Sequence, residues 1–230
     1  MSEPEEIKVV LIGDSGVGKS SIISQYINHK FDPSCESSTN SEFSTKIVDY
    51  PEHNISLKFN IWDTMGQEKY RSLTKIFYKN ADVVILVYDV TCEESFESIK
   101  NYWYNEVIKN ADLSPIIALV GNKADLCPKD KLYNKECVNY ANEINAMFEQ
   151  ISAMSSSGVN GIFEKIGKLF VDPKGNKSHN LSLLNGLYDF NPIKNGKNNN
   201  KNNNNIRYTK NNSIKLHQNI NKSKEKKKCC

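Results

Sequence analysis

The sequence predicts an α/β domain with a mainly parallel β-sheet, and two observations support this fold class. Short runs at residues 7–13, 81–90 and 115–122 are apolar at both alternating positions and rich in β-branched side chains. This pattern is typical of parallel strands that are covered on both faces. Longer amphipathic segments separate the runs, and an alternation of strands and helices favours right-handed crossover connections.

The remaining elements follow from local patterns. Two further strands, 43–50 and 54–62, flank the sequence "PEHN", whose Pro51 and Asn54 are typical turn residues, so we expect a hairpin there. Helical segments are expected at 19–28, 93–110, about 134–146 and 158–171. The regular pattern stops near residue 172. We therefore expect an N-terminal extension at 1–6, a folded domain at 7–171 and a tail at 172–230.

The tail differs from the domain in composition and charge. It contains Asn/Lys-rich stretches such as "NGKNNNKNNNN", which cannot bury enough apolar surface to offset the entropy of ordering, so a disordered tether is expected. The chain carries a net charge of +3, but basic residues outnumber acidic ones by 11 from position 174 onward. A basic tail on an acidic domain favours an anionic partner, either a membrane or a nucleic acid.

The cysteines and the N-terminus indicate the compartment. Cys35, Cys92, Cys127 and Cys137 are scattered without metal-ligand spacing, which is typical of reduced thiols in an intracellular protein. The sequence "MSEPEE" is acidic and polar, so no signal peptide is expected. No run approaches the roughly 20 apolar residues that a membrane-spanning helix requires. We therefore expect this protein to meet any membrane from the cytosol.

The stretch "GDSGVGKS" at residues 13–20 matches the phosphate-loop pattern G-x-x-x-x-G-K-[ST] between an expected strand and an expected helix. Glycines let backbone N–H groups close around phosphates, and the helix N-terminus adds positive potential. Lys19 should reach the β- and γ-phosphates, and the Ser20 hydroxyl should bind Mg²⁺. A chance glycine-rich turn is the weaker alternative. The predicted phosphate-binding residues are Gly13, Asp14, Ser15, Gly16, Val17, Gly18, Lys19 and Ser20.

A second motif, "NKAD" at residues 122–125, follows the third apolar run and falls at the carboxyl edge of the sheet. Asp125 can accept hydrogen bonds from both the N1–H and the exocyclic amine of guanine, a pair that adenine lacks. Such a site discriminates strongly, because the wrong base leaves buried acceptors unpaired. N-K-x-D alone is usually only a loop. After a phosphate loop it favours GTP over ATP, with Asn122, Lys123 and Asp125 as guanine-binding candidates.

A third motif, "WDTMGQ" at residues 62–67, ends another expected strand. Asp63 can hold Mg²⁺ through a water molecule, the Gly66 N–H can meet the γ-phosphate, and Gln67 can orient the attacking water. Phosphoryl transfer depends mainly on positioning and charge stabilisation, so Gln67 is the catalytic candidate. A polar strand-to-helix loop is the alternative, which the other two motifs disfavour.

With these motifs in this order, residues 7–171 resemble the small GTPases of the Ras superfamily, and within it the Rab family. Rab-like sequences are "KFNIW" (58–62), "KYRSLT" (69–74), "FYKNA" (77–81), "LVYDVT" (86–91) and the Cys-Cys ending. The resemblance implies the P-loop GTPase fold, with three layers and a six-stranded, mostly parallel sheet bearing helices on both faces. It also implies slow, Mg²⁺-dependent hydrolysis of GTP to GDP, in a monomer that switches vesicle transport.

The same resemblance implies partners and a location. The expected partners are an exchange factor, a GTPase-activating protein, a GDP-dissociation inhibitor, the Rab escort and prenyltransferase proteins, and effectors of the GTP form. The expected location is the cytoplasmic face of an endomembrane, with a cytosolic pool. The ending "KSKEKKKCC" fits this view. Cys229 and Cys230 are the implied geranylgeranylation sites, although a metal-binding pair or a chance ending is the alternative.

Physical reasoning supports two lipid chains. One chain holds only reversibly, whereas two signals anchor firmly. Each lysine near an anionic leaflet adds about 1 kcal/mol, and the opposing Glu225 subtracts from that total. The lysines in question are Lys222, Lys224, Lys226, Lys227 and Lys228. Nucleic acid is a weaker partner, because Tyr208 is the one aromatic residue among these basic stretches.

The chain departs from the family at its switches. Counting from Lys19 and back from Phe43 places Ser38 where the family has a metal-binding Thr, and a one-residue slip would place Thr39 there. Ser keeps the oxygen but lacks the methyl group that stiffens χ1. Met65 replaces a family Ala beside Gly66 and Gln67.

Two guanine-side positions can also be compared with the family. Phe31 falls where the family places an aromatic ring against guanine, and "ISAM" at 151–154 matches a guanine-contacting loop. Ser152 and Ala153 are retained there, whereas Met154 replaces a Lys. Because the first switch and Met65 are altered, a hydrolysis-impaired, nucleotide-loaded scaffold is the alternative to a working switch.

Overall fold

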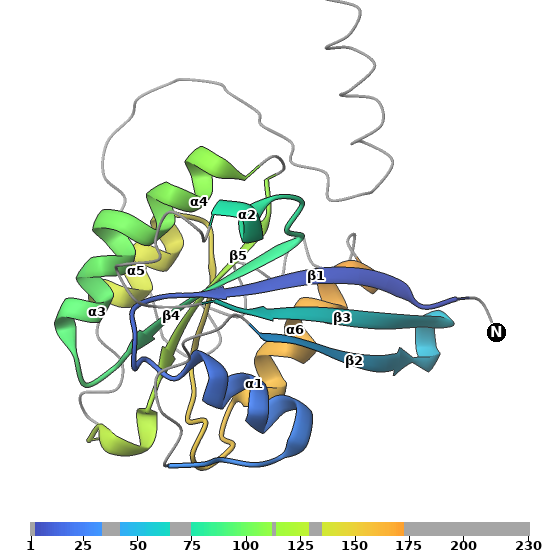
Figure 1. The fold of residues 1–230 in the computed structure, drawn as a ribbon, viewed down its shortest axis with the longest axis horizontal. Coiled ribbons are helices and arrows are strands. Elements are labelled where there is room, and N and C mark those ends of the chain that lie inside the picture. The colour runs from blue at the N-terminus through green and yellow to red at the C-terminus, as the bar shows by residue number, and fades with distance from the viewer. Residues whose placement is uncertain (1–2, 34–41, 65–74, 112–113, 129–134, 173–230) are drawn as a thin grey trace, which may run out of the picture. The chain divides into compact units, whose positions relative to one another are not determined.

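The computed structural model describes residues 3–33, 42–64, 75–111, 114–128 and 135–172, without the side chains of 75 and 76. In this part of the chain, six strands form one sheet with the order β2-β3-β1-β4-β5-β6 (Figure 1). The strands are β1 (Glu5–Ile12), β2 (Glu42–Tyr50), β3 (Ile55–Asp63), β4 (Val83–Asp89), β5 (Ile116–Asn122) and β6 (Met147–Gln150). The predicted six-stranded sheet is confirmed.

One hairpin gives the sheet its antiparallel edge. β2 and β3 pair antiparallel, whereas the other neighbouring pairs are parallel. The turn between β2 and β3 is the short 3₁₀ helix η1 (Pro51–His53), followed by Asn54 at φ 51°. Asn tolerates this left-handed conformation better than most residues, which explains why the predicted "PEHN" turn forms here.

Helices cover both faces of the sheet. The side chains of each central strand alternate between the two faces, so each face has an apolar core that the helices bury. Val9 and Leu11 of β1 belong to one core, which includes residues of α1 (Lys19–Asn28) and α6 (Val159–Val171). Val10 of β1 belongs to the other core, which includes residues of α3 (Glu93–Ser98) and α5 (Lys135–Glu143) on the opposite face of the sheet (Figure 1). This arrangement confirms the predicted three layers.

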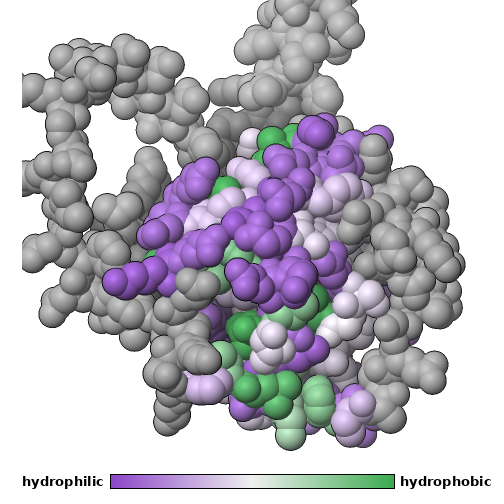
Figure 2. Space-filling model, turned by 90° about the vertical axis from the view of Figure 1, so that its left-hand side faces the viewer, coloured by the Kyte–Doolittle hydropathy of each residue, from purple (hydrophilic) through white to green (hydrophobic). Residues whose placement is uncertain are grey.

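The second layer consists of short helical segments. They are α2 (Lys75–Tyr78), α3 (Glu93–Ser98), η3 (Ile99–Trp103), α4 (Tyr104–Asn110) and α5 (Lys135–Glu143), with the 3₁₀ turn η4 (Ala124–Leu126) after β5. Figure 2 views the side on which α3, α4 and α5 lie, and hydrophilic side chains dominate much of it. In α5, for example, only Cys137 and Ala141 are buried, and the other side chains of the helix are at least partly exposed. No helix in the described ranges is long and apolar enough to cross a bilayer.

One expected helix is confirmed and another needs correction. The helical segment predicted at 93–110 is observed with the same bounds, as α3, η3 and α4 in succession, and η3 is a π-helical turn in which the Tyr104 N–H bonds the Ile99 carbonyl, five residues back. The helix predicted at about 134–146 ends at Glu143, since Asn145 turns into the left-handed region at φ 52°. β6 then begins at Met147, and the sequence patterns predict no strand at that position.

Candidate nucleotide-binding site

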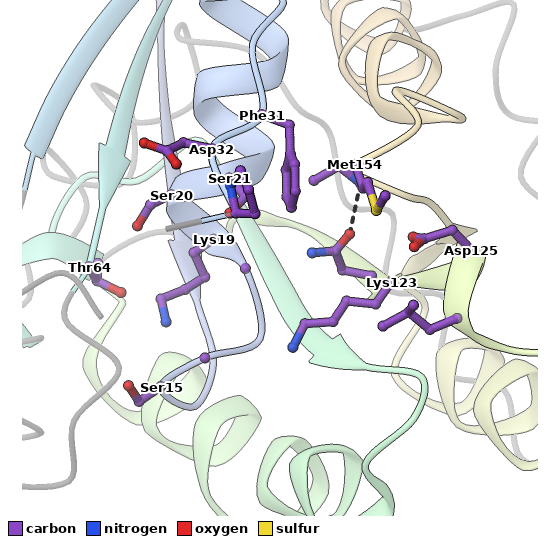
Figure 3. A pocket seen from close by; sticks show the side chains of 16 residues that line it. Ser15, Lys19, Ser20, Ser21, Phe31, Asp32, Thr64, Lys123, Asp125 and Met154 are labelled. Atoms are coloured by element: carbon purple, nitrogen blue, oxygen red, sulfur yellow. Dashed lines mark hydrogen bonds between the residues drawn. The ribbon is translucent and has the colours of Figure 1, made fainter. Parts of the chain in front are cut away.

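The carboxyl ends of β1 and β5 and the loop after β6 surround a cavity of about 250 Å³ (Figure 3). Asp125 and Met154 lie at one end of the cavity, and Ser15 and Thr64 lie at the other. The predicted residues that line the cavity are Ser15, Gly16, Gly18, Lys19, Ser20, Phe31, Asn122, Lys123, Asp125 and Ala153. The structure therefore brings the predicted base-side and phosphate-side residues together.

The remaining predicted residues fall into two groups. Gly13, Asp14, Val17, Asp63 and Ser152 are not among the lining residues, but each is hydrogen-bonded to one of them. Ser38, Thr39, Gly66, Gln67, Cys229 and Cys230 lie outside the described residues, as does Met65. Their roles stay predictions.

The phosphate loop needs glycine at positions where the backbone approaches other groups closely. Gly18 has φ 93°, and a Cβ atom built on it would lie 2.3 Å from Asn122 Nδ2. Gly13 has φ 149°, and its Cβ would lie 2.1 Å from the carbonyl oxygen of Val87. Any side chain at either position would clash, so these glycines let the loop wrap tightly at the end of β1.

Lys19 supplies the positive charge of the loop. Its side chain is buried, and its ammonium group donates to the carbonyl oxygens of Gly13 at 3.0 Å and Asp14 at 2.9 Å. Burial lowers the pKa of this ammonium to about 8, against the opposing attraction of the Asp63 and Asp14 carboxylates. A buried cation with flexible donors suits an incoming phosphate group.

Oxygen ligands for a metal gather beside the lysine. The Ser20 hydroxyl donates to Asp63 Oδ2, and the Asp63 side chain is almost fully buried at the end of β3. The neighbouring Thr64 hydroxyl donates to the Leu11 carbonyl at 2.6 Å, which ties β3 to β1. Hydroxyl and carboxylate oxygens are the ligands that Mg²⁺ prefers, so the donors present here fit that ion.

Asn122 joins the two ends of the site. Its Nδ2 donates to the Val17 carbonyl at 2.9 Å, and its Oδ1 accepts the Ala153 N–H at 3.1 Å. Both bonds are buried and connect segments far apart in sequence. One amide at the end of β5 therefore holds the phosphate loop and the loop after β6 in fixed relation.

At the base end, polar side chains are linked to one another by hydrogen bonds and an ion pair. Asp125 Oδ1 accepts the Ser152 hydroxyl, and Ser152 Oγ in turn accepts the Ser155 N–H at 3.0 Å. Lys123, at φ 66°, forms an ion pair with Asp89 at 2.6 Å. Burial opposes ionisation of Asp89, but hydrogen bonds from Lys123 and Thr91 outweigh it and hold the Asp89 pKa below its usual value.

Sequence reasoning missed several residues of this site. Ser21, Asp32, Pro33, Thr64, Leu126 and Met154 line the cavity without having been predicted to do so. Two signals were available. Thr64 directly follows Asp63 in the "WDTMGQ" motif, and Asp89, the partner of Lys123, lies in the "LVYDVT" sequence at the carboxyl end of β4.

Comparisons with known proteins agree with this geometry. A model of the Ras family matches residues 8–171. Ras-related protein Rab-22A of Mus musculus is 39% identical over 163 residues, which cover 71% of this chain and 82% of that protein. The Homo sapiens protein of the same name is 38% identical over the same shares. GTP-binding protein ypt5 of Schizosaccharomyces pombe is 41% identical over 162 residues, 70% of this chain and 76% of that protein.

Proposed function

Because the chain belongs to the Rab family of small GTPases, a branch of the Ras family, we propose that it is a lipid-anchored GTP/GDP switch in vesicle traffic. Members of this family hydrolyse GTP to GDP, and this chain is such a GTPase. The observation that carries the proposal is the Asn122 amide, which ties a phosphate-binding loop and a base-side loop around one cavity.

At the phosphate end, the backbone N–H groups of residues 13–18 hold the nucleotide phosphates, and Lys19 contributes its positive charge. The ammonium leaves the Gly13 and Asp14 carbonyls for phosphate oxygens, and the negative phosphates keep it protonated at neutral pH. Ser20, a first-switch hydroxyl and Asp63 through water hold Mg²⁺, which when bound neutralises charge on the β- and γ-phosphates.

At the base end, Asp125 reads guanine by accepting two hydrogen bonds, and the Ser152 hydroxyl orients its carboxylate. Phe31 lies over the base, and the methylene stem of Lys123 flanks it. The Ala153 N–H already donates to Asn122, so recognition of the base depends first on Asp125. Adenine offers no matching pair of donors to this carboxylate, and ATP therefore binds far more weakly than GTP.

In the second switch, Gln67 orients the attacking water and the Gly66 N–H meets the γ-phosphate. These roles rest on the motif order, since both residues lie outside the described part of the chain. Intrinsic hydrolysis by this family is slow, so the chain depends on a GTPase-activating protein. Its other partners are an exchange factor, a GDP-dissociation inhibitor, escort and prenyltransferase proteins, and effectors.

The first test is single-turnover hydrolysis of GTP with Mg²⁺ by the full chain and by Ser38→Ala and Thr39→Ala. The parent should bind GTP in preference to ATP and hydrolyse it slowly. Ser38→Ala should slow hydrolysis at least tenfold, because a direct Mg²⁺ ligand is lost. Thr39→Ala serves as the matched control and should behave like the parent.

The other outcomes identify the alternatives. If only Thr39→Ala slows hydrolysis, the switch is shifted by one residue and Thr39 is the ligand. If the parent binds GTP without hydrolysing it, and neither variant behaves differently from the parent, the chain is a nucleotide-loaded scaffold. The altered first switch and Met65 would favour that outcome. A parent that binds no guanine nucleotide would refute the proposal altogether.

A further inference from the structure

Trp103 lies outside the cavity but reaches the phosphate loop from the helical layer. It is the last residue of the π-helical turn η3, and its side chain is fully buried. A π-turn adds a residue to the helical repeat and thereby changes the direction in which the following side chains point. Such turns are frequent at functional sites, so the contacts of the residues that they orient are informative.

One contact of Trp103 is a hydrogen bond to the loop itself. Its indole Nε1–H donates to Asp14 Oδ1 at 2.8 Å, across 89 positions of sequence. The backbone of the same aspartate is also held, because the Asp14 carbonyl accepts the Lys19 ammonium at 2.9 Å. Asp14 is thus bound by its side chain to the helical layer and by its carbonyl to the lysine of the loop.

The chemistry of the two groups makes this bond directional. The indole N–H can only donate, so a buried tryptophan needs an acceptor. An ionised carboxylate is the strongest ordinary acceptor, and bonds to it are shorter and stronger than neutral ones. The same carboxylate carries a negative charge in a loop that must receive phosphates. A fixed donor on the helix side can hold this charge in place while the backbone N–H groups remain available.

We propose that Trp103 is a positioning residue of the phosphate site, which fixes the loop conformation through the Asp14 carboxylate. This inference rests on the proposed function, since the ligand that the loop holds is a guanine nucleotide. Trp103 does not touch the nucleotide. Loss of the indole removes this bond to the Asp14 carboxylate, loosens the loop and speeds nucleotide release, while the preference for guanine over adenine is unchanged.

The test measures release of a fluorescent GDP analogue from the full chain. Trp103→Phe keeps an aromatic ring but removes the donor, and it should accelerate release roughly tenfold, the factor expected for a lost hydrogen bond to a charged group. In an Asp14→Ala background the same change should alter release by less than about twofold, because the partner is already absent.

Val107→Ala is the matched control for loss of packing. Val107 lies one turn further along, in α4, is fully buried in the same core cluster and makes no polar side-chain contact. If Val107→Ala and Trp103→Phe destabilise the ligand-free protein equally, Val107→Ala should still release GDP at nearly the parent rate. Equal acceleration by Val107→Ala, or parent-like release by Trp103→Phe, would overturn the proposal.

A spectroscopic measurement remains decisive if Trp103→Phe fails to fold. The chain has two tryptophans and hence two indole N–H resonances. In the GDP complex, Asp14→Ala should move one of them strongly upfield and leave the other in place. If both resonances stay unchanged, the hydrogen bond does not exist in solution. A parent that binds no GDP would instead refute the proposed function before any variant is compared.

Discussion

At the scale of single residues, the site contains groups that favour ligand binding over stability. Lys19 is the clearest case, because its ammonium is buried and its pKa is lowered to about 8 by that burial. In the ligand-free protein the charged form is thus disfavoured relative to the unfolded chain, where the pKa is near 10.5. Protonation of Lys19 is a cost to folding that phosphate binding offsets.

This cost has a defined pH dependence. Between pH 8 and 10.5 the unfolded chain holds the proton more tightly, so the Lys19 contribution to stability rises with pH. Below pH 8 both states are protonated and the penalty, of the order of 3 kcal/mol, is fully present. We expect Lys19→Met to raise the free energy of unfolding of the ligand-free chain at pH 7, and to abolish most nucleotide binding.

The measurement is denaturant unfolding of nucleotide-free parent and variant between about pH 7.5 and 9.5, with nucleotide titrations alongside. The difference in stability should shrink as the pH rises, since the parent loses its buried charge. A difference that stays constant with pH would mean that Lys19 titrates normally in the folded protein.

At the scale of elements, close packing of α6 on the sheet depends on one glycine. A Cβ atom on Gly167 would lie 1.8 Å from the Tyr50 hydroxyl oxygen, at the end of β2, and 3.3 Å from the Phe59 ring in β3. We expect Gly167→Ala to lower the free energy of unfolding by about 1–3 kcal/mol, because overpacking outweighs the better helix propensity of alanine. Thermal and denaturant unfolding of the two proteins would measure it.

The same helix supplies the control. A Cβ atom on Gly161 would meet nothing within 4 Å, so Gly161→Ala should stabilise the chain by roughly 0.5–1 kcal/mol. Tyr50→Phe removes the nearest atom, the hydroxyl oxygen, but leaves Cζ at 2.7 Å, so it should restore only part of the stability of Gly167→Ala. If both glycine variants changed stability in the same direction, packing against Tyr50 would not be the reason for the glycine.

Elements also show how far the sequence determines the structure. β4 and β5 were predicted because both faces of each are buried, which leaves a continuous apolar run. β6 was not predicted, because its sequence, "MFEQ", contains no β-branched residue. The strand lies at the edge of the sheet, where the apolar pattern is weaker. The π-turn at 99–103 has no local signal either, since "IKNYW" reads as ordinary helix.

For the site, the sequence predicted ligand-facing groups better than supporting ones. Lys19, Asn122 and Asp125 stand in motifs whose spacing reflects ligand geometry, so they could be identified. The bond from Trp103 to Asp14 could not be, because it depends on the phase of a helix 89 residues away. The Ala153 N–H shows a further limit. It donates to the Asn122 side chain in this structure, and no motif specifies that pairing.

At the scale of the whole molecule, charge and lipid together should decide location. The basic tail and the two terminal cysteines predict that the geranylgeranylated chain sediments with vesicles containing anionic lipid. Cys229→Ser with Cys230→Ser should remain in solution, and Cys230→Ser alone should bind reversibly, since one chain gives only marginal affinity. Sedimentation at low and high salt measures this, and the lysine contribution should fall as salt rises.

The matching control replaces the five lysines from 222 to 228 by Gln and leaves both cysteines in place. It should bind neutral vesicles like the parent but lose the preference for anionic ones. Binding that survives removal of both cysteines at high salt would show that something other than lipid anchors the chain.

The position of β1 has one further consequence for the molecule. This strand pairs with β3 on one side and β4 on the other, and Val9 to Ile12 are fully buried. Its amide hydrogens cannot meet water unless the sheet and both helical layers separate, so deuterium should replace them only as fast as the entire domain unfolds. The loop that receives the nucleotide phosphates therefore begins one residue beyond a segment whose amides exchange only when the domain unfolds.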